Sequence, residues 1–417
     1  MIEHRAVLVV PEIPAPPRCG NAWRDLQQLD VLRRLGFTVH IVAACPRWDL
    51  PEDEEATAVG ALGGGVTYLT RRRESPSEAL VATLARKATY LALPTVHPFG
   101  WWLPRNLAPV VADLAGATSD VLVIRSIFVH EIPALRRVWP GRIVVDCHDS
   151  DVHLARELIK TVRGLARLGP WANLVGVRRT IARFLPLADE AWAVSVEDAA
   201  RLAGEAPGAR LLVVPSGMDR AGAAAAARPG VDGRALLVAN FGYGPNARGA
   251  DWLLRLVWPA VRGRVPTATL ACVGARMSPA LERLAAATPG AEACGQVADL
   301  TPLLRDAAVV LAPVLEGGGT RLKIVEAWSQ GKAVVTTSRG VEGLPAPAGA
   351  VAISDEPREF AATVAALLVD GARRHALGTR ALAVFAERLS WDVAGRTVAA
   401  RSVIAGGAPR LRTAAAS

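Results

Sequence analysis

The sequence predicts an α/β protein of two domains, each built around a parallel β-sheet. Three observations lead to this fold class. Short apolar runs that suit buried parallel strands alternate with helix-length stretches along the chain. The alternation begins twice, at residues 6–10 and again at residues 235–239. Each of these first strands runs into a loop rich in glycine or proline, as in α/β sheets that bind ligands at their carboxyl edge.

The totals fit this architecture and limit the partners. The chain has 417 residues, enough for two domains, and is 51% hydrophobic and 21% charged, as expected of a globular protein with large cores. Its formal net charge of +9 favours anionic partners such as nucleotide phosphates or anionic lipids. The basic run at residues 71–73 lacks interleaved aromatic side chains, so we expect no nucleic-acid partner.

The cysteines and the apolar runs indicate the compartment. Five cysteines without a CxxC pair predict neither a disulfide framework nor a zinc site, and they favour a reducing compartment. Residues 1–14 have too short an apolar core for a signal peptide and are expected to contain the first strand. No apolar run approaches the ~20 residues of a membrane span. The alanine- and arginine-rich composition suggests a GC-rich genome, and we expect a cytoplasmic bacterial protein.

In the first half of the chain, apolar runs mark the strands and glycines mark helix ends, as Gly36 does for the first helix. Residues 51–65 are expected to form a surface loop, and the aromatic segment 94–104 to line an acceptor pocket or pack in the core. The expected strands are residues 6–10, 38–43, 121–124, 143–145, 190–194 and 211–214. The expected helices are residues 21–35, 77–91 and 195–203, with two amphipathic helical stretches within residues 156–186.

Two loops of this half carry polar residues at strand ends. Gly20, Asn21 and Arg24 lie near the start of the first helix, where they could face a phosphate or an acceptor, or simply form a turn. The strand at 143–145 runs into a polar cluster that contains His148 and Asp149. Histidine can carry a proton or donate a hydrogen bond near neutral pH. The carboxylates could equally cap the next helix, and so short a cluster does not define a metal site.

The stretch 156–186 is strongly basic, with Glu157 as its one acidic residue. Basic amphipathic helices can lie on anionic membranes, although an ordinary solvated outer face is the alternative. The low-complexity stretch 221–233 is expected to belong to a linker.

The second half of the chain repeats the α/β pattern. The glycine loop at residues 240–249 contains Gly242 and Arg248, and Val297 follows Gly295 ahead of a short helix. The expected strands are residues 235–239, 268–273 and 308–312 and one further strand after Gly331. The expected helices are residues 247–261, 299–306, 320–331, 359–368 and a final helical part around 389–392.

The most informative stretch is residues 312–344. The strand at 308–312 ends at Gly317, Gly318 and Gly319, and Thr320 is a plausible N-cap of the helix that follows. A helix N-terminus favours an anion, and Arg321 and Lys323 add positive charge there.

Glu326 lies three residues beyond Lys323, where its carboxylate could accept hydrogen bonds from two sugar hydroxyls. An anion site followed by a diol site suits a nucleoside diphosphate. The alternative is a simple glycine turn followed by a surface i,i+3 pair.

The whole string resembles the donor-site signature of the retaining glycosyltransferases of family 4 (glycosyl transferases group 1), in the branch with GGGTRLK. The matching residues are Gly318, Gly319, Thr320, Arg321, Leu322, Lys323, Glu326, Ala327, Gly331, Val334, Val335, Thr336, Gly340 and Gly343. Residues 215–219 (PSGMD) are similar to the interdomain signature of that family, with Ser216 in place of Asn.

The resemblance implies the GT-B fold of two facing Rossmann-like domains. It implies an acceptor-binding domain at residues 1–215, a linker at 216–233, a nucleotide-sugar domain at 234–385 and a helix at 386–417 that returns to the first domain. The implied catalytic residues are His148, Arg321, Lys323 and Glu326. The implied donor-binding residues are Gly242, Arg248, Val297, Gly317, Gly318, Gly319 and Thr320, and the implied acceptor-side residues are Gly20, Asn21, Arg24 and Asp149.

The chain departs from the family pattern in two places. Gly318 stands where many members have the first of two carboxylates, and Glu316 is the nearest substitute. Arg248 is the one basic residue in the glycine loop 240–249, where many members have two.

The function expected from the resemblance is retaining, metal-independent transfer of a sugar from a nucleoside-diphosphate sugar to an acceptor hydroxyl, without a cofactor. A cell-envelope or exopolysaccharide glycan is favoured as acceptor, with peripheral contact to an anionic membrane, and a small secondary metabolite is the alternative. An epimerase or phosphorylase of the same shape and an inactive nucleotide-sugar-binding scaffold remain as rivals.

Overall fold

The computed structural model describes residues 4–12, 20–46, 64–71, 106–115, 119–148, 150–160, 162–219, 224, 226–297, 299–317 and 321–405. Contacts between residues divide the chain into unit 1, which comprises Met1–Ser216 and Ala394–Ser417, and unit 2, which comprises Gly217–Val393. The helix predicted at 77–91 and the aromatic segment 94–104 lie outside the described residues.

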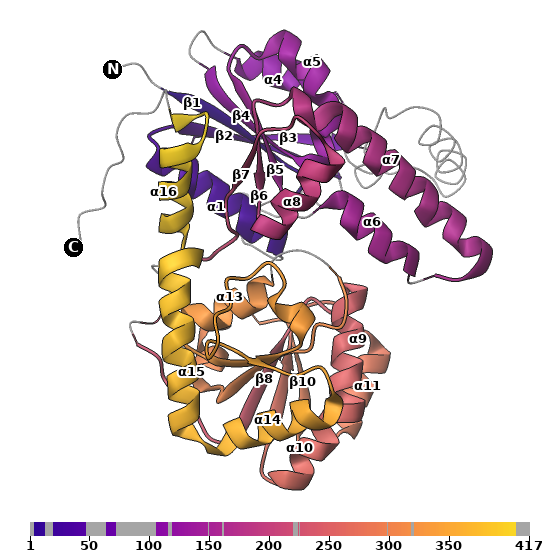
Figure 1. Cartoon of the computed structure of the whole chain (residues 1–417), viewed down its shortest axis with the longest axis vertical. Coiled ribbons are helices and arrows are strands. Elements are labelled where there is room, and N and C mark those ends of the chain that lie inside the picture. Colours follow the sequence, from indigo (N-terminus) through magenta and orange to yellow (C-terminus); the bar gives the residue numbers. More distant parts are fainter. Residues whose placement is uncertain are drawn as a thin grey trace. The chain divides into compact units, whose positions relative to one another are not determined.

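Unit 1 contains a seven-stranded sheet in the order β3-β2-β1-β4-β5-β6-β7, and every neighbouring pair is parallel. Its strands are β1 Arg5–Val10, β2 Thr38–Pro46, β3 Val66–Arg71, β4 Ser119–Arg125, β5 Arg142–Cys147, β6 Glu190–Ala193 and β7 Leu211–Val213. Its helices are α1 Gly20–Arg34, α4 Ala108–Leu114, η3 Ser126–Glu131, α5 Ile132–Val138, α6 Asp151–Lys160, η4 Gly164–Arg167, α7 Leu168–Phe184, η5 Leu185–Leu187 and α8 Val196–Glu205. Helices α6 and α7 lie side by side as a hairpin (Figure 1).

The strands of unit 1 are apolar on both faces because helices cover both sides of the sheet. Successive side chains of a strand point to opposite faces. In β1, Val7 and Val9 therefore belong to one buried cluster, whereas Leu8 and Val10 belong to the other. This two-sided burial explains why the strands appear in the sequence as continuous apolar runs.

Unit 2 contains a six-stranded parallel sheet in the order β10-β9-β8-β11-β12-β13. Its strands are β8 Arg234–Val238, β9 Thr269–Val273, β10 Ala291–Gly295, β11 Val309–Ala312, β12 Ala333–Thr336 and β13 Ala352–Ile353. Its helices are α9 Gly244–Trp252, η6 Leu253–Val257, α10 Trp258–Arg264, α11 Pro279–Ala287, α12 Thr301–Asp306, α13 Leu322–Ser329, η7 Ser338–Val341, α14 Pro357–Val369, α15 Gly371–Val384 and η8 Phe385–Leu389.

Both sheets have a switch point, at which the strand order reverses direction. It lies between β1 and β4 in unit 1 and between β8 and β11 in unit 2. The loops that follow two such strands leave the sheet on opposite sides and open a crevice at its carboxyl edge, where ligands bind in open α/β sheets. The loops singled out by the sequence follow these strands or their neighbours.

The last helix, α16 Trp391–Arg401, begins in unit 2, and its residues from Ala394 onward belong to unit 1. Within unit 2, Trp391 Nε1 donates a hydrogen bond to the carbonyl of Gly217 at 3.0 Å. Within unit 1, the buried carboxylate of Glu190 accepts hydrogen bonds from Ser402 Oγ and from the Val403 backbone amide. The end of the described chain is therefore fixed to strand β6.

The predicted α/β class with two parallel sheets is confirmed. The helix expected from residue 247 begins earlier, at Gly244, because Pro245 suits the first turn of a helix. Strands β3, β10 and β13 and helices α4, α5, α11 and α15 were not predicted from the sequence.

The described residues include three free cysteines and no helix that could span a membrane. Cys147 in β5 and Cys272 in β9 are free and almost fully buried, and Cys294 is free and half-buried. In the described part of the chain, no helix has the length and apolar character needed to cross a membrane.

Candidate functional site

At the switch point of unit 2, the loop after β8 meets the loop after β11. Lys323 Nζ at the start of α13 donates a hydrogen bond to Asn246 Oδ1 in α9 at 2.7 Å. Arg248 in α9 forms an ion pair with Glu316 in the other loop. A Cβ atom on Gly249 would lie 2.1 Å from the Pro313 carbonyl oxygen, so the two loops can pack this closely only because Gly249 has no side chain.

The approach to α13 is shaped by Gly317 and Arg321. Gly317 has a φ of +92°, in the left-handed region, and a Cβ there would lie 3.0 Å from Tyr243 Oη. Its carbonyl accepts a hydrogen bond of 2.7 Å from Nη2 of the buried Arg321. The predicted donor-loop residues Gly318, Gly319 and Thr320 lie outside the described residues.

Burial shifts the pKa values of the two charged residues of α13, Lys323 and Glu326. It lowers the pKa of Lys323 to about 8, and the neighbouring Arg321 charge acts in the same direction. Burial also raises the pKa of Glu326 to about 7. Both groups therefore titrate close to neutral pH, which is common at functional sites.

The remaining predicted donor residues lie in loops at the carboxyl ends of β8, β10 and β11. The Gly242 amide donates to Asn240 Oδ1 at 3.1 Å, and a Cβ on Gly242 would lie 2.8 Å from the side chain of Arg276. Val297 follows β10 at the outer edge of the sheet, two strands from β8. Glu316, the nearest substitute for the carboxylate that Gly318 replaces, is paired with Arg248.

At the switch point of unit 1, two buried ion pairs connect α1 to the ends of β4 and β5. Arg24 Nη2 lies 2.7 Å from Asp146 Oδ1, and both side chains are 1% exposed. Arg24 Nη1 donates a further hydrogen bond to the Val214 carbonyl at 2.7 Å. Arg125 Nη1 lies 3.1 Å from Asp25 Oδ1.

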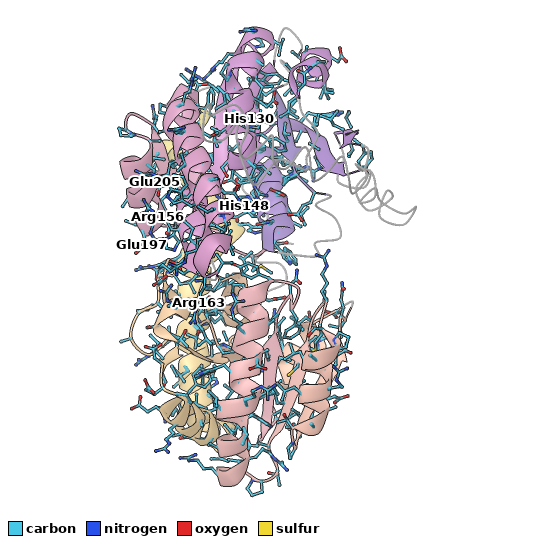
Figure 2. The ribbon with its side chains drawn as sticks, turned by 90° about the vertical axis from the view of Figure 1, so that its right-hand side faces the viewer. His130, His148, Arg156, Arg163, Glu197 and Glu205 are labelled. Atoms are coloured by element: carbon cyan, nitrogen blue, oxygen red, sulfur yellow. The ribbon has the colours of Figure 1, made fainter. Side chains whose placement is uncertain are left out.

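His148, which is labelled in Figure 2, lies against these pairs. Its Nε2 atom is 2.9 Å from Asp146 Oδ2 and 3.5 Å from Asp25 Oδ1. Its Nδ1 atom is 3.3 Å from Oδ1 of Asn21. The imidazole is thus held between the end of β5 and the first turn of α1.

The pKa shifts of this cluster follow from burial and charge. Burial opposes the ionisation of Asp146, but Arg24 and His148 outweigh it and hold the pKa of Asp146 well below its usual range. Burial raises the pKa of Asp25 to about 7, because Arg125 offsets only part of the desolvation. Burial and the charge of Arg125 lower the pKa of His148 to about 3. His148 is therefore a neutral imidazole at physiological pH, which can donate or accept a hydrogen bond.

The predicted acceptor-side residues differ in their placement. Gly20 and Asn21 are exposed at the start of α1, whereas the guanidinium of Arg24 is buried and already bound to Asp146 and Val214. Asp149 lies outside the described residues. Sequence reasoning missed Asp25 and Arg125, although a charged residue at the end of a buried strand such as β4 was an available signal.

Among the described residues, no group of three or more histidine, cysteine, aspartate or glutamate side chains is arranged to hold a metal ion. The expected independence from metal remains a prediction, because Asp149 of the polar cluster after β5 lies outside the described residues.

Comparison with known proteins identifies the architecture. Residues 232–370 match the family model of the glycosyl transferases group 1. No curated protein sequence matches the chain.

Many solved structures resemble the whole chain. A glycosyltransferase from Rickettsia africae ESF-5 is 12% identical, with a TM-score of 0.60 over 95% of this chain and 97% of that one. Anabaena Alr3699/HepE in complex with UDP and glucose is 12% identical, with a TM-score of 0.62 over 95% and 99%. The α,α-trehalose 6-phosphate synthase from Burkholderia multivorans is 14% identical, with a TM-score of 0.62 over 97% and 100%. At these identities the likeness shows the fold, which is GT-B, and with the group 1 domain it supports a glycosyltransferase.

The buried pair between Arg24 and Asp146 yields a stability prediction. Asp146→Asn should lower the free energy of unfolding of unit 1 by about 3–5 kcal/mol, because it leaves the buried Arg24 charge uncompensated. Chemical denaturation followed by circular dichroism measures this loss.

Asp120→Asn is the matched control, because Asp120 lies in the same sheet and its pair with His4 is partly exposed. We expect the control to lose less than about 1 kcal/mol. Equal losses in the two variants would contradict the importance of the buried pair.

Proposed function

We propose that this protein is a retaining glycosyltransferase that moves a sugar from a nucleoside-diphosphate sugar to an acceptor hydroxyl without a metal ion. The observation that carries the proposal is the switch point of unit 2, where Arg321 precedes α13 and Lys323 and Glu326 lie on α13, within the region matched by the family model. UDP is the first donor nucleotide to test, because the Anabaena structure contains UDP.

The proposed chemistry uses the charges of α13. As the bond between the sugar C1 and the β-phosphate oxygen breaks, the acceptor oxygen bonds to C1 on the same face, and its proton passes to the leaving phosphate. Arg321 and Lys323 would stabilise the negative charge that develops on that phosphate. Glu326 would accept hydrogen bonds from the ribose diol, and Arg248, Val297 and the glycines at 242 and 317–319 would shape the remaining nucleotide site.

On unit 1, we assign His148 to a hydrogen bond with the transferring sugar, a role that suits its neutral imidazole. The residues proposed on the acceptor side are Gly20, Asn21 and Asp149. Arg24 joins them through Asp146, since its contacts hold the carboxylate that lies against His148.

For the acceptor, we propose a cell-envelope or exopolysaccharide glycan assembled at the inner face of the plasma membrane, because the α6–α7 hairpin is strongly basic. A small secondary metabolite is the alternative acceptor. An inactive nucleotide-sugar-binding scaffold is the alternative of another class, and the pairing of Glu316 with Arg248 favours it by leaving the first carboxylate position without a replacement.

A thermal-shift panel with UDP, GDP, ADP and TDP in the presence of EDTA tests the nucleotide site. We expect one diphosphate, UDP first, to raise the melting temperature, since a ligand at 100 times its Kd adds about 2.7 kcal/mol to stability. No shift with any of the four would contradict the donor-site assignment.

Incubation with the matching sugar nucleotide and candidate acceptors then tests catalysis. Transfer with retained anomeric configuration, read by NMR, is the expected result. Nucleotide binding without transfer or hydrolysis would instead favour the scaffold.

Removal of the Lys323 charge should affect the reaction and spare the fold. We expect Lys323→Ala to lower kcat by about 10²–10³, the cost of one group that stabilises transition-state charge. Its melting temperature should stay close to that of the unmodified protein. Unchanged turnover would reject the assignment of Lys323.

Lys332→Ala provides the contrast. Lys332 Nζ donates to the backbone carbonyls of Arg228, Arg305 and Ala307 at 2.6–3.2 Å, so its loss should lower the melting temperature.

The two titrating groups of α13 predict a bell-shaped pH dependence of nucleotide affinity. Glu326, with a pKa of about 7, must be ionised to accept hydrogen bonds from the diol, so affinity should fall below pH 7. Lys323, with a pKa of about 8, must be protonated to bind phosphate, so affinity should also fall above pH 8. Calorimetric titration with UDP from pH 6.5 to 9 at constant ionic strength measures both limbs.

Two variants test which residue causes each limb of the pH profile of nucleotide affinity. Glu326→Gln should remove the acidic limb and keep the alkaline one, whereas Lys323→Arg should shift the alkaline limb out of this range. A Glu326→Gln profile that keeps both limbs would show that another group titrates.

A further inference from the structure

In unit 2, Asn246 holds the side chain of Lys323. Lys323 Nζ donates a hydrogen bond of 2.7 Å to Asn246 Oδ1. The carboxamide of Asn246 is itself fixed, because its Nδ2 donates to the Asn240 carbonyl at 3.0 Å. That carbonyl also accepts a hydrogen bond from the Tyr243 backbone amide. The position of Nζ therefore depends on the loop after β8 and the start of α9, although Lys323 itself lies on α13.

The orientation of the Asn246 carboxamide is set by its two partners. An ammonium group can only donate hydrogen bonds, and a backbone carbonyl can only accept them. The oxygen of Asn246 must therefore face Lys323, and its nitrogen must face the Asn240 carbonyl. An apolar side chain would make neither contact, and an ionised aspartate would make only the first.

The group that holds Lys323 carries no charge. Lysines in protein interiors are usually paired with a carboxylate. Among the described residues, none forms an ion pair with Lys323, and the pKa of nearby Glu326 is shifted by burial alone. Burial and the charge of Arg321 lower the pKa of Lys323 to about 8. At neutral pH the ammonium group is thus mostly protonated, and no described carboxylate cancels its charge.

Arg248, which also lies on α9, is held in a different way. It forms an ion pair with Glu316 in the loop after β11. A carboxylate partner cancels much of the field of a cation, whereas a neutral amide partner leaves that field in place. Of the two contacts that α9 makes with the second loop and α13, only the one through Asn246 fixes a cation and keeps its charge.

We propose that Asn246 is a positioning residue for Lys323. Its amide oxygen holds Nζ at the switch point of unit 2 without cancelling the ammonium charge, so the charge is in place before a nucleoside diphosphate binds. A side chain that is already fixed loses less conformational entropy on binding than a free one. This inference rests on the donor site proposed above and names the residue that prepares one of its cations.

The contact between Asn246 and Lys323 can be tested without nucleotide. Asn246→Asp keeps the oxygen that accepts from Nζ and adds a negative charge. That charge favours the protonated amine, so the pKa of Lys323 should rise from about 8 to about 9 or higher. Acetylation with acetic anhydride over a series of pH values, read by mass spectrometry, measures this pKa, because only the neutral amine reacts. The chain has few lysines to distinguish: Lys87, Lys160, Lys323 and Lys332.

Arg255→Gln is the matched control for charge. It lowers the net charge by one, as Asn246→Asp does, at an exposed position of η6, which directly follows α9. The pKa of Lys323 should stay the same in this control. An unchanged pKa in Asn246→Asp, or an equal rise in the control, would overturn the contact.

A double-mutant cycle with calorimetric titration of UDP tests the positioning role. Asn246→Ala should weaken UDP binding about 2- to 10-fold, because Lys323 regains freedom that it must lose on binding. In a protein that already carries Lys323→Ala, the same substitution should have no further effect, since its effect passes through Lys323. Losses of equal size in both backgrounds would show that Asn246 supports only the fold, and would overturn the inference.

Asn246→Asp should change the pH profile of UDP affinity in a way that a structural role alone would not. Its carboxylate neutralises Lys323, so UDP should bind about 10- to 100-fold more weakly at neutral pH. The alkaline limb should move to higher pH, because the raised pKa keeps Lys323 protonated there. In Arg255→Gln the affinity should change less than about twofold and the limb should stay in place. An alkaline limb that also stays near pH 8 in Asn246→Asp would reject the role of Asn246.

The labelling and the titration together separate this inference from the donor-site proposal. If the pKa of Lys323 rises in Asn246→Asp but none of UDP, GDP, ADP and TDP binds the unmodified protein, the donor site is rejected and the role of Asn246 in it is rejected as well. If a nucleotide binds and the losses in the cycle are additive, the role of Asn246 alone is rejected.

Discussion

Parallel strand pairing is the constraint on which the rest of this structure depends. Every strand of both sheets is parallel to its neighbours, so all the loops that follow strands leave at one edge of each sheet. At that edge, the switch points bring together α1, β4 and β5 in unit 1, and the loops after β8 and β11 in unit 2. The strands β1, β8 and β11 are largely buried and are apolar apart from Arg5 and Arg234. The buried pairs of Arg24 with Asp146 and of Arg125 with Asp25 lie where the strand order of unit 1 reverses.

The sequence predicted the features of parallel pairing that depend on neighbouring residues alone, namely the buried strands and the glycine loops that follow them. Strands buried on both faces need continuous apolar runs, so β1, β5, β8 and β11 were found without knowledge of their partners. Glycine loops at strand ends led to the proposed donor region, and the structure shows why glycine suits position 317: its φ is positive, and a Cβ there would lie in tight contact with the Tyr243 hydroxyl. The GT-B class followed from a resemblance that covers most of the chain, and the fold confirms it.

The features that sequence reasoning missed depend on distant partners or weak local patterns. The ion pair between Arg24 and Asp146 joins residues 122 positions apart, and nothing near Arg24 indicates that its charge is buried. The same is true of Asp25 and Arg125, which are 100 positions apart. Strand β10 reads AEACG, a pattern too short and too polar to mark an edge strand. The pairing of Arg248 with Glu316 likewise becomes visible only when two loops meet.

Buried Cys147 in unit 1 and buried Cys272 in unit 2 can each report how often the core of their own unit opens to solvent. Burial raises the pKa of Cys272 in unit 2 to about 12 and holds the pKa of Cys147 in unit 1 well above its usual range. Since the thiolate is the reactive form, alkylating reagents can modify these thiols only after the surrounding sheet opens. Cys147 directly follows Asp146, which pairs with Arg24, so its alkylation would report opening of the sheet next to that ion pair. The alkylation rates of the two peptides would therefore measure, in one sample, how often each core opens independently of the other.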